Sequence, residues 1–206
     1  MSTQRAAGLT SHQSLVTSHH AGLASILALA LALAASPGLR TAHAQDSSHA
    51  LRASEAVKPQ VFVSIEPVPQ GRKFEIAVVA QVADGYHVQA NKVLEDYLIP
   101  LTVTADLPAG FKLLNTVYPK AQLTKFPFAA KPMVVYEGKF QVRLSVEADA
   151  SVPAGAVKIP MTLRFQACND QLCLPPAKLP IAAEFTVAPA GAPAKTIHPE
   201  IFATKP

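Results

Sequence analysis

The chain has 206 residues, of which 50% are hydrophobic, and its formal net charge is +4. Two of the basic residues, Arg5 and Arg40, fall within the first 44 residues, and without them the net charge is about +2. This small charge argues against nucleic acid or an anionic membrane as a partner. The roughly 160 residues that follow suit one domain.

The first 44 residues are predicted to be a cleaved signal peptide. Arg5 supplies a positive charge, residues 21–35 are all small or apolar, and Ala42-His43-Ala44 is typical of a cleavage site. The apolar run is shorter than the roughly 20 residues of a membrane-spanning helix. An uncleaved membrane anchor is the alternative. We expect export to the periplasm, with no stable membrane insertion after cleavage.

Residues 60–187 are predicted to form an all-β domain. Short runs rich in β-branched and aromatic residues alternate with Gly- and Pro-containing turns, and only residues 90–97 suit a short helical turn. The expected extended segments are 61–65, 74–82, 86–89, 99–104, 111–118, 134–136, 140–146, 159–165 and 179–187. About seven to nine such strands are typical of an immunoglobulin-like β-sandwich. Residues 45–59 are expected to be a flexible leader, and residues 188–206 a disordered Ala- and Pro-rich tail.

The only two cysteines, Cys168 and Cys173, are separated by four residues and lie between an apolar run and Pro175-Pro176. This spacing fits the tip of a β-hairpin, where facing Cβ atoms lie about 4.5–5.5 Å apart and a disulfide can close. In an oxidising compartment such a pair stays bonded. A loop this short gives little entropic stabilisation, about 2 kcal/mol, which favours a chemical role over a purely structural one.

Three interpretations of the cysteine pair can be compared from the residues alone. One is a static bond that staples the hairpin. Another is reversible dithiol–disulfide exchange, which needs an exposed sulfur as the point of attack and a second thiol to resolve the mixed disulfide. The third is a zinc site, which usually needs about four ligands; two cysteines and at most one nearby histidine are too few.

A Cys–His hydrolase is also disfavoured, because no histidine lies between His87 and His198. We therefore expect no metal and no cofactor.

The two cysteines have different sequence surroundings. Cys168 follows the apolar run 159–165, so its strand should hold it close to the sandwich. Cys173 follows the polar tip Asn169-Asp170-Gln171 and precedes two prolines, which cannot donate to a central ladder. Cys173 is therefore predicted to lie nearer an edge and to be the sulfur that a partner attacks.

Residues 165–176 resemble the active-site hairpin of the N-terminal domain of the thiol:disulfide interchange protein DsbD family. Shorter matches occur in the same order along the chain, so the resemblance covers about residues 58–187. These matches are Asp84-Gly85-Tyr86-His87, Tyr97-Leu98-Ile99-Pro100, Tyr118-Pro119-Lys120 and Val135-Tyr136-Glu137-Gly138. The resemblance implies an immunoglobulin-like fold and a periplasmic role in passing reducing equivalents. It also implies that Cys173 forms the mixed disulfide with partner proteins and that Cys168 resolves it.

The resemblance further implies an aromatic cap over the disulfide. The matching stretch is residues 123–131, in which Phe126 and Phe128 are the cap candidates, and either ring can instead belong to the core. Better-known family members have carboxylates in this loop. Here no acid lies between Asp106 and Glu137, and Lys120, Lys125 and Lys131 lie there instead.

Tyr86, His87 and Asp170 are possible neighbours of the cysteine pair. His87 and Gln89 stand where family members have tyrosines near the site, although a half-exposed strand histidine is the default interpretation of His87. Family members usually continue into a multi-helix membrane domain and a thioredoxin-like domain, which do not follow residue 187 here. We therefore expect the partners to be separate thioredoxin-like proteins or a membrane thiol reductase. The alternative function is a non-catalytic immunoglobulin-like binding module with a structural disulfide.

Overall fold

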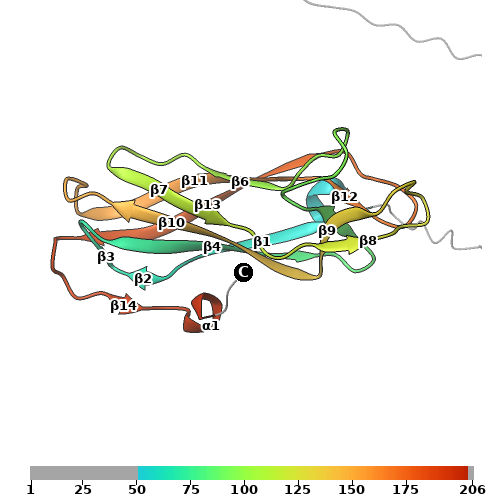
Figure 1. Ribbon diagram of the computed structural model, residues 1–206. Helices are drawn as coiled ribbons and strands as arrows, with labels where there is room; N and C mark the ends of the chain where they lie inside the picture. The colour runs from blue at the N-terminus through green and yellow to red at the C-terminus, as the bar shows by residue number, and fades with distance from the viewer. Residues whose placement is uncertain (1–50, 204–206) are drawn as a thin grey trace, which may run out of the picture. The chain divides into compact units, whose positions relative to one another are not determined.

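The computed structural model of the chain describes residues 51–203 (Figure 1). The predicted signal peptide and the first residues of the predicted leader lie outside this range. The described part contains fourteen β-strands, one 3-10 helix and one short α-helix. It is an immunoglobulin-like β-sandwich, so the all-β prediction is confirmed.

Two four-stranded sheets form the body of the sandwich (Figure 1). The first has the order β1 (Val57–Val63), β4 (Lys73–Val82), β10 (Lys139–Ala148) and β7 (Phe111–Val117). The second has the order β3 (Val68–Pro69), β13 (Ala177–Ala188), β11 (Gly155–Phe165) and β6 (Thr102–Ala105). Neighbouring strands are antiparallel, except that β3 runs parallel to β13.

The core lies between these two sheets. Side chains of both sheets belong to one buried cluster, which includes Ile76 and Leu144 of the first sheet and Leu163 of the second, all with 0% exposure. The strands alternate buried and exposed positions, because successive residues of a strand point to opposite faces. Across the core, the ring of Phe74 lies 5.0 Å from that of Phe185, centroid to centroid.

A third, smaller sheet carries the cysteine hairpin. Its order is β12 (Ala167–Cys168), β5 (His87–Gln89), β9 (Met133–Glu137) and β8 (Gln122–Thr124), all antiparallel. Three of its strands are joined to strands of the large sheets by short connections: β4 leads into β5, β9 into β10, and β11 into β12. The small sheet is therefore an extension of the sandwich at the end where β12, β8 and β9 are seen (Figure 1).

The N-terminal boundary of the folded domain lies earlier than the sequence predicts. Residues 53–55 form the 3-10 helix η1 (Ala53–Glu55), and β1 starts at Val57, inside the segment expected to be a flexible leader. Ala56 and Val57 are 0% and 1% exposed, and β1 pairs with β4 along its whole length. Because this segment is polar in composition, its sequence did not predict that the edge strand β1 begins within it.

The C-terminal segment is also ordered, contrary to the predicted disordered tail. Strand β14 (Lys195–Thr196) pairs with β2 (Ile65–Glu66), and α1 (Pro199–Phe202) follows it. The carbonyl of Ile201 accepts hydrogen bonds from Arg143 Nη2 at 3.1 Å and Gln141 Nε2 at 3.3 Å, and the Arg143 guanidinium lies 5.5 Å from the Phe202 ring centroid. Long-range contacts to β10, rather than local periodicity, therefore order this segment.

Residues 90–97, where a short helical turn was considered, form bends and turns instead of a helix. Among residues 51–203, no helix is both long and apolar enough to cross a membrane.

Candidate redox site

The site is built on a tight hairpin closed by a disulfide between Cys168 and Cys173. The bond length is 1.98 Å, and the two Cα atoms lie 3.9 Å apart. Asn169 shapes the tip: its Oδ1 accepts hydrogen bonds from the backbone N–H groups of Gln171 and Leu172, both at 2.9 Å. Below the disulfide, the Leu174 N–H donates to the Ala167 carbonyl at 2.8 Å. The hairpin and the disulfide predicted from the spacing are therefore both present.

The two cysteines differ sharply in exposure. Cys168 belongs to β12 and is 0% exposed, whereas Cys173 is exposed. Pro175 and Pro176, which follow Cys173, are exposed as well. Attack on a disulfide requires access to one sulfur along the S–S axis. Of the two cysteines, Cys173 is therefore the one that can be reached from solvent.

Gln89 contacts the buried sulfur. It lies in β5, next to β12, and its Nε2 donates a hydrogen bond to Cys168 Sγ at 3.6 Å. Gln89 is 0% exposed, and its Oε1 has no hydrogen-bond partner. Gln89 stands where family members have a tyrosine, but it was not among the site residues predicted from the sequence.

His87 is the strand neighbour of Cys168, since the two residues face each other across the β5–β12 pair. It is 2% exposed, which corrects the expectation of a half-exposed strand histidine. Burial lowers the pKa of His87 from 6.5 to about 4, while the nearby carboxylate of Asp170 acts in the opposite direction. His87 is therefore neutral at pH 7, and its Nε2 has no hydrogen-bond partner.

A pocket of about 300 Å³ brings four of the predicted site residues together. Tyr86, His87, Phe126 and Asp170 line it, together with the turn that joins β4 to β5 and the turn that joins β9 to β10. Neither cysteine lines this pocket. Two of its lining residues are close to the disulfide: His87 faces Cys168 across the β5–β12 pair, and Asp170 lies in the cysteine hairpin.

The family model described as "Thiol:disulfide interchange protein DsbD, N-terminal" matches residues 52–183. The chain belongs to this family. No curated protein matches it significantly.

Solved structures with a similar fold share little sequence with this chain. The DsbD N-terminal domain of Neisseria meningitidis in the reduced form is 17% identical, with a TM-score of 0.41 over 71% of this chain and 94% of that one. The N-terminal periplasmic domain of ScsB from Proteus mirabilis is 12% identical, with a TM-score of 0.42 over 62% of this chain and 48% of that one. A complex of the Neisseria meningitidis DsbD and PilB N-terminal domains is also similar, at 19% identity and a TM-score of 0.39 over 66% of this chain and 85% of that one.

The two cap candidates of this DsbD N-terminal domain occupy different positions. Phe126 is 6% exposed and packs with Leu98, Met133 and Val135, whereas Phe128 is 40% exposed. The Phe126 ring stacks on His87 with centroids 3.9 Å apart and planes 15° apart. The Phe128 ring lies 5.6 Å from Phe126 and 6.4 Å from His87. The rings thus form a stack that starts at the strand neighbour of Cys168.

The two lysines of residues 123–131, the predicted cap segment, have partners other than the sulfurs. Lys125 Nζ donates to the carbonyls of Ala129 and of Ala130, the latter at 2.6 Å, and so closes the cap loop on itself. Lys131 Nζ forms an ion pair with Glu95 at 2.9 Å. Both lysines of residues 123–131 therefore have hydrogen-bond or ion-pair partners of their own.

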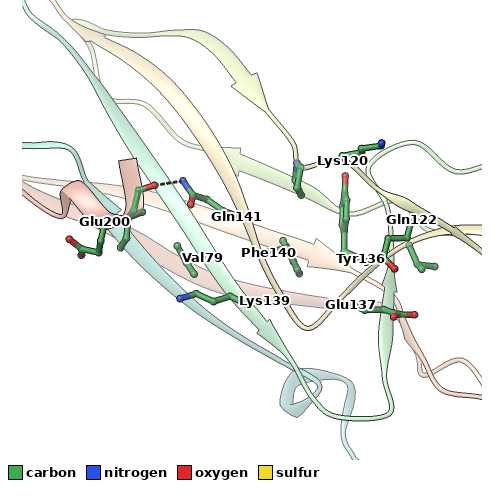
Figure 2. A pocket seen from close by; sticks show the side chains of 12 residues that line it. Val79, Lys120, Gln122, Tyr136, Glu137, Lys139, Phe140, Gln141 and Glu200 are labelled. Carbon is green, nitrogen blue, oxygen red and sulfur yellow. Dashed lines mark hydrogen bonds between the residues drawn. The ribbon is translucent and has the colours of Figure 1, made fainter. Parts of the chain in front are cut away.

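A second pocket, of about 350 Å³, shares Glu137 with the first pocket and no other lining residue. Figure 2 shows it between the β9–β10 hairpin, the segment around Lys120 and Gln122, and α1, with Gln141 hydrogen-bonded to the carbonyl of Ile201. Its lining contains none of the predicted site residues. No cluster of side chains suited to a metal ion occurs within residues 51–203.

Proposed function

We propose that this DsbD N-terminal domain is a periplasmic thiol–disulfide exchange module. It passes reducing equivalents through a reversible Cys168–Cys173 disulfide, from a separate reductase to oxidised envelope proteins. The observation that carries the proposal is the pairing of an exposed Cys173 with a fully buried Cys168 at the tip of a hairpin. Such a pair offers one sulfur to partners and keeps the other for resolution.

In the proposed reduction, a thiolate of the reductase attacks Cys173 Sγ. A new bond joins the reductase sulfur to Cys173, the Cys168–Cys173 bond breaks, and the electron pair remains on Cys168 as a thiolate. A second thiol of the reductase then displaces Cys173, which leaves a dithiol on this chain and a disulfide on the reductase.

The proposed second half-reaction runs in the opposite sense. The Cys173 thiolate attacks a disulfide of the envelope protein, and one sulfur of that protein leaves as a thiolate. Cys168 then attacks Cys173, which releases the reduced envelope protein and restores the disulfide. The natural partners are proteins with an accessible dithiol, as in thioredoxin-like domains, or a membrane thiol reductase.

The reduction potential of the pair tests this proposal against a binding module with a structural bond. We expect a value in the range from thioredoxin to disulfide isomerases, about −270 to −180 mV, whereas structural disulfides lie below about −300 mV. The purified domain is equilibrated in glutathione or dithiothreitol buffers, and the free thiols are counted by alkylation and mass spectrometry. A potential below about −300 mV would refute the exchange function.

A further inference from the structure

In the proposed exchange, the buried sulfur must carry a negative charge. When Cys173 is attacked, negative charge develops on Sγ of Cys168, a residue that is 0% exposed. An ionised group in such a place is costly unless it is paired or hydrogen-bonded. Lys125 and Lys131 are engaged with backbone carbonyls and with Glu95, and Lys120 lines the second pocket. Asp170 in the same hairpin has the wrong sign.

The described residues supply a neutral donor at this sulfur. Gln89 Nε2 lies 3.6 Å from Cys168 Sγ, and a disulfide sulfur, which has no hydrogen, can only accept this bond. Hydrogen bonds to charged acceptors are about twice as strong as those between neutral groups. The contact is therefore weak in the resting disulfide and strengthens as the thiolate forms, which is the condition for lowering the barrier.

The other end of the same amide is unsatisfied. Its Oε1 is buried and has no partner, and a buried polar atom without a partner is a cost that calls for an explanation. The backbone fixes the residue in place, since the Gln89 N–H donates to the Gln166 carbonyl at 3.2 Å and β5 lies between β12 and β9. The backbone of Gln89 is thus held beside β12, and Cys168 Sγ is the hydrogen-bond partner of its side-chain amide.

We propose that Gln89 is a catalytic residue of this domain, whose side-chain N–H stabilises the Cys168 thiolate that leaves when a partner attacks Cys173. The proposal rests on the proposed exchange function. It needs no proton transfer in the bond-breaking step, because the electron pair of the S–S bond remains on Cys168. In the reverse direction, the same hydrogen bond keeps Cys168 ready as a thiolate for its attack on Cys173.

The test replaces Gln89 with methionine, which has a similar length and no N–H donor. In the oxidised protein, we expect reduction by dithiothreitol to slow about ten-fold, the usual effect of one hydrogen bond to a charged group. In a Cys173→Ser background, we expect Gln89→Met to raise the pKa of the Cys168 thiol. This pKa is measured from the thiolate absorbance near 240 nm as a function of pH. Gln166→Met is the matched control, because the Gln166 side chain donates to the Leu174 carbonyl and accepts from the Ile99 N–H, both of them backbone groups. It should leave both quantities nearly unchanged.

A measurement on the protein with Gln89 intact covers the case in which Gln89→Met does not fold. In the Cys173→Ser protein, the side-chain amide resonances of Gln89 should shift with pH along the same curve as the ionisation of Cys168. Unchanged reduction rate and thiol pKa in a folded Gln89→Met variant, or amide resonances that ignore the ionisation of Cys168, would overturn the proposal. A wild-type potential in the structural range would instead refute the exchange function, and it would leave these readouts of the thiolate contact valid.

Discussion

The two sulfurs of the hairpin have surroundings that suit different roles. Cys168 is enclosed by β5 and hydrogen-bonded by Gln89, so it is shielded from partners and provided with a donor. Cys173 is exposed and precedes two exposed prolines, which leaves space for a partner. The asymmetry was predicted from the polar tip and the prolines, and the exposures agree with it.

We predict that single-cysteine variants differ in their ability to trap a partner. Cys168→Ser leaves the exposed Cys173 without its resolving thiol, so it should form a stable mixed disulfide with a thioredoxin-like protein whose own resolving cysteine is removed. Cys173→Ser leaves a buried thiol and should trap at least ten-fold less, roughly the effect of a barrier of 1.4 kcal/mol to exposing the sulfur. Non-reducing electrophoresis followed by mass spectrometry measures both. Equal trapping by the two variants would contradict the assignment of roles.

The cap segment is the element that the sequence left undecided, and the structure gives the two rings different places. Phe126 stacks directly on His87, whereas Phe128 is the outer, exposed ring. We predict that Phe126→Ala accelerates reduction of the disulfide by dithiothreitol about five-fold, because an aromatic pair contributes about 1 kcal/mol to keeping the loop closed. Stopped-flow measurements of thiol appearance provide the rate.

Phe128→Ala is the matched control for the cap, since it removes a ring of the same type that is 40% exposed. It should change the rate less than Phe126→Ala does. If Phe126→Ala leaves the rate unchanged in a folded protein, the stack does not restrict access to the disulfide. If Phe128→Ala has the larger effect, the outer ring is the gate.

The elements that the sequence predicted well are those whose signals are local. The hairpin of Cys168 and Cys173 was evident from its spacing and its prolines, and the long strands from their β-branched runs. The partners of the buried sulfur were not evident in this way. Gln89 meets Cys168 only through the pairing of β5 with β12, and the two residues lie 79 positions apart in the chain. A single sequence contains no local signal for such a register.

The short C-terminal elements were missed for the same physical reason. β14 pairs over two residues and α1 has four, so neither has the length that gives a periodic pattern. Their order comes from long-range contacts to Phe62 and to Arg143: the His198 ring lies 5.0 Å from Phe62, and Arg143 binds the Ile201 carbonyl. Composition rich in Ala and Pro is therefore a poor guide where the rest of the domain offers such partners.

At the scale of the whole domain, the small sheet is held rigidly by its continuity with the sandwich. β4, β10 and β11 are core strands, and each is joined by a short connection to a strand of the sheet that carries the disulfide. The β9–β10 turn at Gly138 requires a positive φ of 60°, which glycine adopts without strain. The Val82 N–H donates to the Gly138 carbonyl at 2.8 Å, which ties this turn to β4. Side chains on such strands are placed more precisely than side chains on loops.

The stability of the whole domain should depend on pH through His87. Burial lowers the pKa of His87 in the folded protein to about 4, whereas the unfolded chain has the ordinary value of 6.5. Between these values the unfolded chain binds a proton that the folded protein does not, so the free energy of unfolding falls as the pH falls from 6.5 to 4. The loss attributable to His87 is roughly 3 kcal/mol once the pH is well below 4, and it vanishes well above pH 6.5.

We predict that His87→Phe removes this part of the pH dependence. Phenylalanine preserves a ring for the stack on Phe126 and cannot bind a proton, so the unfolding free energy of the variant should fall less between pH 6.5 and 4 than that of the wild type. Urea unfolding of the oxidised protein at a series of pH values, followed by circular dichroism, gives both curves. Groups that do not contact His87 act equally in the two proteins, so the difference between the curves reports His87 together with its neighbour Asp170. Parallel curves over this range would show that the imidazole is protonated in the folded domain as readily as in the unfolded chain. They would refute the conclusion that His87 is buried and neutral beside Cys168.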